Sequence, residues 1–147
     1  MPTIARFLEA QNSPSNGYAD ALAELHAERK VSHWIWYIFP QLKGLGTSPM
    51  AQNYGIRDLR EAREYAEHPV LCARLIEITA VVQRHLAAGA SPENLMGGRT
   101  DAMKLVSSMT LFARAAQDRA LQEACEDVLT RTETQGYTRC AYTLRAS

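Results

Sequence analysis

The stretch HWIWYIFP, residues 33–40, decides the fold class of this chain, because it permits either a short strand or one to two turns of helix before Pro40. Few other β-like runs are present that could pair with a strand, so the sequence favours a short helix. In a helix, Trp34 and Trp36 project about 200° apart, and a single core face cannot hold both rings. The segment is therefore expected to be enclosed from several sides or to line a cavity.

On both sides of this stretch, apolar residues recur at helical spacing. Before it, two short patterns separated by turn-forming residues predict a helical hairpin over residues 4–29, with Asp20, Glu24 and Glu28 on a solvated side. After it, the longest predicted helix begins at His68-Pro69. Its apolar residues alternate four and three apart, which indicates a core-facing stripe of Leu71, Leu75, Ile78, Val82 and Leu86.

Capping residues predict where other helices begin, at Ser48, Asp58, Ser91 and Asp118. Thr100 or Asp101 is the expected cap of a further helix that runs through Ala115. No alternating strand and helix units occur, so the pattern predicts an all-α fold, a compact irregular bundle of six to seven helices. Residues 1–135 are expected to form a single domain, and residues 136–147 a flexible C-terminal tail.

Composition narrows the class of protein. The chain has 147 residues, which suits one domain, and its 16 Lys and Arg balance 16 Asp and Glu, so no global positive field draws it to nucleic acid or to a membrane. Its three cysteines have no metal or disulfide spacing, and its four histidines are scattered, so no metal site and no cofactor are expected. Without an apolar membrane-spanning run or a signal sequence, we expect a cytoplasmic protein of open oligomeric state.

The first candidate site lies at the start of the aromatic stretch. Lys30 and His33 place a cation and a titratable imidazole beside the indoles of Trp34 and Trp36, a combination that suits stacking a ring while neutralising phosphate. The alternative is that the indoles anchor the core and that His33 is a hydrogen-bonded core histidine.

Two further segments complete the candidate site. The loop from Gln41 leads into a predicted helix N-terminus, where free N–H groups favour an anion; its candidate ligand-binding residues are Gln41, Gly44, Gly46 and Ser48. The alternative is a plain loop with tight turns. In the helix after Gly98, Lys104 and Ser108 share one face, and Asp101 can pair with Lys104. A capped, solvated face is the alternative there.

Residues 29–56 resemble the hallmark motif of the domain of unknown function 1810 family. Residues 64–71 and 104–112 resemble that family's other motifs, and the similarity extends from about Ile4 to Leu129. The resemblance implies a compact, mainly helical single domain and no established reaction.

A more distant similarity is to the helical NADAR domains, which are associated with hydrolysis of N-glycosidic bonds in ADP-ribosylated or nucleotide-like compounds. His33 and Trp34 stand where those domains carry a glutamate-bearing aromatic motif. The residues that resemble pieces of their pattern are Ser48, Pro49, Met50, Ala51, Gly55, Gln117, Leu121, Leu129 and Thr130.

These observations give two functional hypotheses. The first is an N-glycosidase acting on a phosphate-bearing, nucleotide-like or ADP-ribose-like molecule, with His33 moving the proton and Asp101 stabilising the cationic sugar. Trp34 or Trp36 would then stack the base, and Lys30, Lys104 and the 44–48 backbone would hold phosphate. The second is a non-catalytic module that binds a small molecule or a protein through the aromatic segment 33–39. A third possibility is that this segment is simply core.

Overall fold

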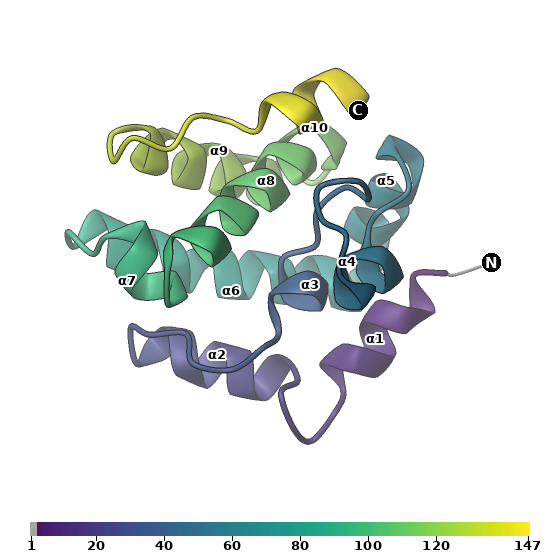
Figure 1. Cartoon of the computed structure of the whole chain (residues 1–147), viewed down its shortest axis with the longest axis horizontal. Helices are drawn as coiled ribbons and strands as arrows, with labels where there is room; N and C mark the ends of the chain where they lie inside the picture. The colour runs from purple at the N-terminus through teal and green to yellow at the C-terminus, as the bar shows by residue number, and fades with distance from the viewer. Residues whose placement is uncertain (1–2) are drawn as a thin grey trace.

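The computed structural model describes residues 3–147 and is built from helices (Figure 1). The all-α prediction is confirmed: within these residues no strand forms, and Leu42 and Ile56 make an isolated β-bridge. Ten helices form there rather than six to seven. Four of them are short, with four to six residues each: α3, α4, α7 and α10. Their bounds are α1 Ala5–Gln11, α2 Tyr18–His26, α3 Ile35–Ile38, α4 Pro49–Tyr54, α5 Leu59–Glu67, α6 Pro69–Ala87, α7 Pro92–Met96, α8 Arg99–Ala115, α9 Arg119–Glu133 and α10 Ala141–Ala146.

Four helix starts follow the predicted capping chemistry. The side chains of Ser48, Asp58, Ser91 and Asp118 each accept a hydrogen bond from a backbone N–H group three residues later, as predicted. The prediction for α8 was wrong, because this helix begins at Arg99 with Gly98 as its N-cap and has no side-chain cap. Asp101 lies inside α8, and its carboxylate is engaged in ion pairs instead.

The core is organised around α8, which packs against α3, α5, α7, α9 and α10, while α6 supports it through α9 and α5. The predicted stripe of α6 is confirmed, since all five of its apolar residues are buried. The hairpin of α1 and α2 lies on the other side of α6 in Figure 1. The side chains of α8 therefore reach both the core and the surface cleft described below.

The aromatic stretch forms the short helix α3, as predicted, with Trp34 as its N-cap residue. Trp34 is fully buried, whereas Trp36 is half-buried, so the two indoles lie in different environments. Contacts with α1, α4 and α8 enclose α3 from several sides.

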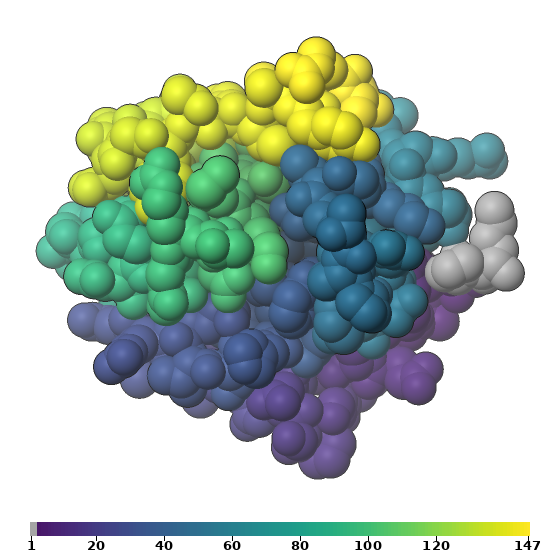
Figure 2. All heavy atoms as spheres, in the orientation of Figure 1, coloured from purple at the N-terminus to yellow at the C-terminus, as the bar shows by residue number. Residues whose placement is uncertain are grey.

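The segment after Gly136 lies along α8 and ends in α10. Tyr137 is buried, and the backbone N–H group of Cys140 donates to Thr110 Oγ1. The Tyr142 hydroxyl donates to the carbonyl oxygen of Lys43 at 3.0 Å, and Figure 2 shows this segment, in yellow, packed on the blue residues that carry that loop. Flexibility of residues 136–147 in solution stays a prediction. Within residues 3–147, no helix is long and apolar enough to cross a bilayer.

Candidate functional site

Asp101 on α8 lies between two lysine side chains. Its Oδ2 atom is 2.7 Å from Lys30 Nζ, and its Oδ1 atom is 3.6 Å from Lys104 Nζ. The Lys30 ammonium is buried: it also donates to the Ser32 carbonyl oxygen and lies 4.9 Å from the centroid of the Trp34 ring. Two ammonium groups therefore share one carboxylate, which leaves this cluster with one unit of positive charge.

Glu24 on α2 fixes the conformation of the chain before α3. Its Oε1 atom accepts hydrogen bonds from the backbone N–H groups of Val31 and Ser32 and from Trp34 Nε1, at 2.8, 2.9 and 3.0 Å. Partial burial acts to raise the pKa of Glu24, but the hydrogen bond from the Ser32 hydroxyl, together with those from the backbone and Trp34, outweighs it and holds the pKa below its ordinary value. Glu24 is therefore a structural acceptor on the more solvated side of α2, where Asp20 and Glu28 are exposed and Glu24 itself is half-buried.

The two indoles differ in what they offer a ligand. Trp34 has no exposed surface, which matches the alternative that it anchors the core. Trp36 lies under the cation of Lys104, whose Nζ atom is 4.8 Å from its ring centroid. The Nε1 atom of Trp36 is buried and has no hydrogen-bond partner in the described part of the chain. Both indoles thus border the charged cluster, Trp34 from a fully buried position and Trp36 from a half-buried one.

A pocket of about 300 Å³ opens between α8 and the loop that follows α3. We call it the Lys104 pocket; it is lined by Gln41, Leu45, Thr100, Met103, Lys104 and Ser107. Gln41 is buried, and it lines the wall of this pocket. The structure therefore brings together two predicted ligand-binding residues, Gln41 and Lys104, on one wall.

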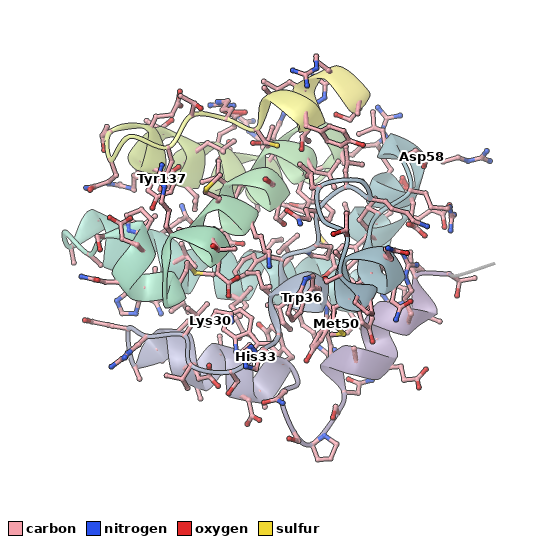
Figure 3. All side chains as sticks on the ribbon, in the orientation of Figure 1. Lys30, His33, Trp36, Met50, Asp58 and Tyr137 are labelled. Atoms are coloured by element: carbon pink, nitrogen blue, oxygen red, sulfur yellow. The ribbon has the colours of Figure 1, made fainter. Side chains whose placement is uncertain are left out.

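Other predicted site residues lie outside this pocket. His33 is exposed, and Figure 3 shows it at the α2 side of the molecule, away from the segment that carries Tyr137. His33 and Asp101 are both absent from the lining of the Lys104 pocket. Ser108 is fully buried, and its hydroxyl has no partner in the described residues. The predicted catalytic pair thus shares no wall of this pocket.

Gly44 and Ser48 of the glycine loop each have a structural role. Gly44 has φ +103°, and a side chain there would collide with the Tyr142 hydroxyl. Ser48 is occupied as the cap of α4, where its Oγ atom accepts from Ala51 N at 3.1 Å. Gly44, Gly46 and Ser48 do not line the Lys104 pocket. Gly44 therefore shapes the contact with α10, whereas Leu45 of the same loop lines the pocket wall.

A second pocket, of about 270 Å³, lies between α8 and the C-terminal segment. We call it the Tyr137 pocket; it is lined by Arg99, Met103, Val106, Ser107, Gly136, Tyr137, Thr138, Arg139, Cys140 and Ala141. Burial acts to raise the pKa of the Cys140 thiol, but hydrogen bonds from the Ser107 hydroxyl and from backbone N–H groups lower it overall. Sequence reasoning missed this pocket because it treated residues 136–147 as a tail.

Metal-binding side chains do not gather in the part of the chain that the structure describes. No group of three or more His, Cys, Asp or Glu residues there is arranged to hold a metal ion. Cys72, Cys125 and Cys140 are free thiols.

Fold and pockets together define a small, single-domain, all-α protein with two adjoining pockets beside its central helix. Over residues 2–140 the sequence matches the family described as "Protein of unknown function (DUF1810)", and the chain belongs to that family. The conserved hypothetical protein Rv1873 from Mycobacterium tuberculosis, known from a crystal structure at 1.38 Å, is similar in fold with a TM-score of 0.80. It is 40% identical over 97% of this chain and 94% of that chain. No curated protein matches this chain significantly.

Proposed function

We propose that this protein binds a small, phosphate-bearing, nucleotide-like molecule in the Lys104 pocket. The observation that carries the proposal is the sharing of Asp101 by two ammonium groups. Lys30 forms the shorter contact and is buried, so it takes up most of the carboxylate's charge. Lys104, at 3.6 Å and a quarter exposed, keeps positive charge to offer at the pocket wall.

The uncharged residues of the pocket support the same ligand chemistry. The amide of Gln41 can donate to a phosphate oxygen beside the Lys104 ammonium, and hydrogen bonds to charged groups are stronger than neutral ones. Leu45 and Met103 give the pocket apolar walls, as in most small-molecule sites. A phosphate attached to an organic group fits this mixture better than a free inorganic ion.

Hydrolysis of an N-glycosidic bond stays a prediction from the sequence. A general acid or base must reach the reacting atoms directly or through one water, and neither His33 nor Asp101 lines the Lys104 pocket. Binding is therefore the function that we propose first. We also propose a cytoplasmic location, because the three cysteines are free thiols and the cytoplasm keeps thiols reduced.

An NMR titration of backbone amides with inorganic phosphate and with AMP tests the proposal. We expect shifts at residues 41–45 and 100–107, and we expect Lys104→Met to weaken phosphate binding at least about fivefold through loss of a charged contact. Lys43→Met is the matched control. Lys43 is an exposed lysine between Gln41 and Leu45, and it does not itself line the pocket. Absence of shifts in these residues, or equal weakening by both variants, would overturn the proposal.

The same samples test turnover. Incubation of the protein with AMP, followed by chromatography for free adenine, reports cleavage of the N-glycosidic bond. Adenine release that His33→Ala abolishes would support the sequence prediction of a hydrolase, because His33 is exposed and its loss should not unfold the protein. Binding without release would reject a hydrolase for this substrate.

A further inference from the structure

We infer that the Lys104 pocket and the Tyr137 pocket are two compartments of one cleft, and that the ligand is a nucleoside monophosphate with its phosphate beside Lys104 and its base beside Arg99. This inference rests on the proposed function and names its ligand class. It moves the base from the predicted indole platform to the neighbouring pocket across Met103 and Ser107.

The register of α8 places the two compartments side by side. Met103 and Ser107, four residues apart, line both pockets and form the ridge between them. Arg99 lies one turn before Met103 and lines only the Tyr137 pocket, whereas Lys104 lines only the Lys104 pocket. One cation therefore stands on each side of a shared ridge.

The Met103 side chain can change its conformation to admit a ligand. The Met103 side chain is 53% exposed although it is a large apolar group. Methionine is unbranched and has three rotatable bonds, so it adapts its shape to what binds against it. A ligand that lies across Met103 would cover this exposed apolar surface and connect the two compartments.

The sizes of the compartments favour joint occupancy. Small-molecule sites usually have volumes of roughly 300 to 1,000 Å³. At about 270 and 300 Å³, each compartment alone is at or below the lower end of that range. Only the two together fall well inside it, which favours a ligand made of two linked parts.

Arg99 gives the Tyr137 pocket its preference for a flat ring. Its guanidinium carbon lies 4.9 Å from the centroid of the Tyr137 ring, and Tyr137 is fixed by a hydrogen bond from its hydroxyl to Glu93. A guanidinium group that lies over one aromatic ring can stack a second planar ring on its other face.

The neighbouring arginine does not compete for this role. Arg139, which also lines the pocket, is held by ion pairs with Glu126 and Glu133. Arg99 interacts with the Tyr137 hydroxyl and, at longer range, with Glu93, but among residues 3–147 no carboxylate lies within ion-pair distance of it. The base is therefore assigned to the Arg99 side, where the guanidinium plane is available.

NMR titrations with inorganic phosphate, adenosine and AMP test the inference in the wild-type protein and in two Arg99 variants. We expect AMP to bind at least about tenfold more tightly than phosphate, as two occupied compartments require. Arg99→Ala and Arg99→Lys should each reduce this advantage to less than about threefold while phosphate affinity stays within about twofold. Arg119→Ala, an exposed arginine on α9 outside both pockets, should change neither value.

The outcomes separate this inference from the proposed function. If phosphate binds at Lys104 but AMP binds no more tightly, or if Arg99→Lys keeps the full advantage of AMP, the assignment of the base is wrong and the proposed function stands. If neither phosphate nor AMP binds, the proposed function fails and the inference fails with it.

Discussion

Lys30 Nζ and Asp101 Oδ2 lie 2.7 Å apart, and this ion pair joins the start of the aromatic stretch to the first turn of α8. The Lys30 side chain is 5% exposed and the Asp101 side chain 23% exposed, so the pair is largely removed from water. Two residues that the sequence assigned to ligand binding and to catalysis therefore hold the fold together. Lys104, the neighbour of this pair, is the cation that faces a pocket.

Asp101→Asn should be strongly destabilising. The substitution leaves the buried Lys30 ammonium without its carboxylate, and breaking such a pair costs about 3 to 5 kcal/mol of unfolding free energy. Lys104→Met should cost less than about 1 kcal/mol, because it removes a partly exposed pair at i,i+3 and one cation–π contact. Urea unfolding measures both values. Equal costs for the two variants would contradict the division of roles between Lys30 and Lys104.

Glu24 should make the unfolding free energy depend on pH. The folded-state pKa of Glu24 lies below its unfolded value, so its contribution is fully present above the unfolded pKa of about 4.3 and is lost as the pH falls through the folded-state pKa. Glu24→Gln should therefore lower the unfolding free energy by about 1 to 2 kcal/mol at pH 7, with the deficit shrinking below about pH 4. Denaturant unfolding across pH 3–7 checks this. Glu9→Gln, at an exposed position on α1, should show no such trend.

The two tryptophans should respond differently to the same substitution. Trp34→Phe removes a donor to Glu24 and leaves space in the core, so we expect a loss of about 2 to 3 kcal/mol. Trp36→Phe removes an indole N–H group that has no partner in the described residues, so the loss should stay below about 1 kcal/mol. Thermal unfolding compares them. A larger loss for Trp36→Phe would show that Trp36 is the core anchor.

Cys140 should be the first thiol to react with iodoacetamide near neutral pH. Its pKa is lowered, whereas burial raises the pKa of both Cys72 and Cys125, and the thiolate is the reactive form. Mass spectrometry of tryptic peptides measures the order of alkylation. Cys140 also lines the Tyr137 pocket, so saturating AMP should slow its alkylation. Faster modification of Cys72 would contradict this order.

Local patterns in the sequence predict most of the helices, but they do not predict the contacts that form the site. The stripe of α6 and the caps at Ser48 and Asp58 depend on residues close together in the chain, so they were predictable. The acceptor role of Glu24 depends on a loop that turns back onto α2, and the position of Asp101 depends on where Lys30 is buried. Such pairings between distant segments leave no periodic signal.

The same reason explains the missed pocket. Gly136 interrupts the helical pattern. The residues after it show no amphipathic stripe, so the sequence does not indicate which of them pack against the core. Tyr137 nevertheless packs into the core, and Cys140 binds Thr110 through its backbone. Lys104 and Gln41 were identified because a cation on a helix and a polar residue after an aromatic run are visible in sequence, although nothing in the sequence showed that they share a wall.

The hydrogen bond from Tyr142 to Lys43 spans 99 positions of the chain, and this separation affects the order of events during synthesis. At about 5 to 20 residues per second, a ribosome needs roughly 5 to 20 s to make the residues between them. During that interval the loop around Gly44 has been made but its partner on α10 has not. The nascent chain therefore carries an unfinished loop and an uncovered α8 surface for seconds, a window in which chaperones can bind it.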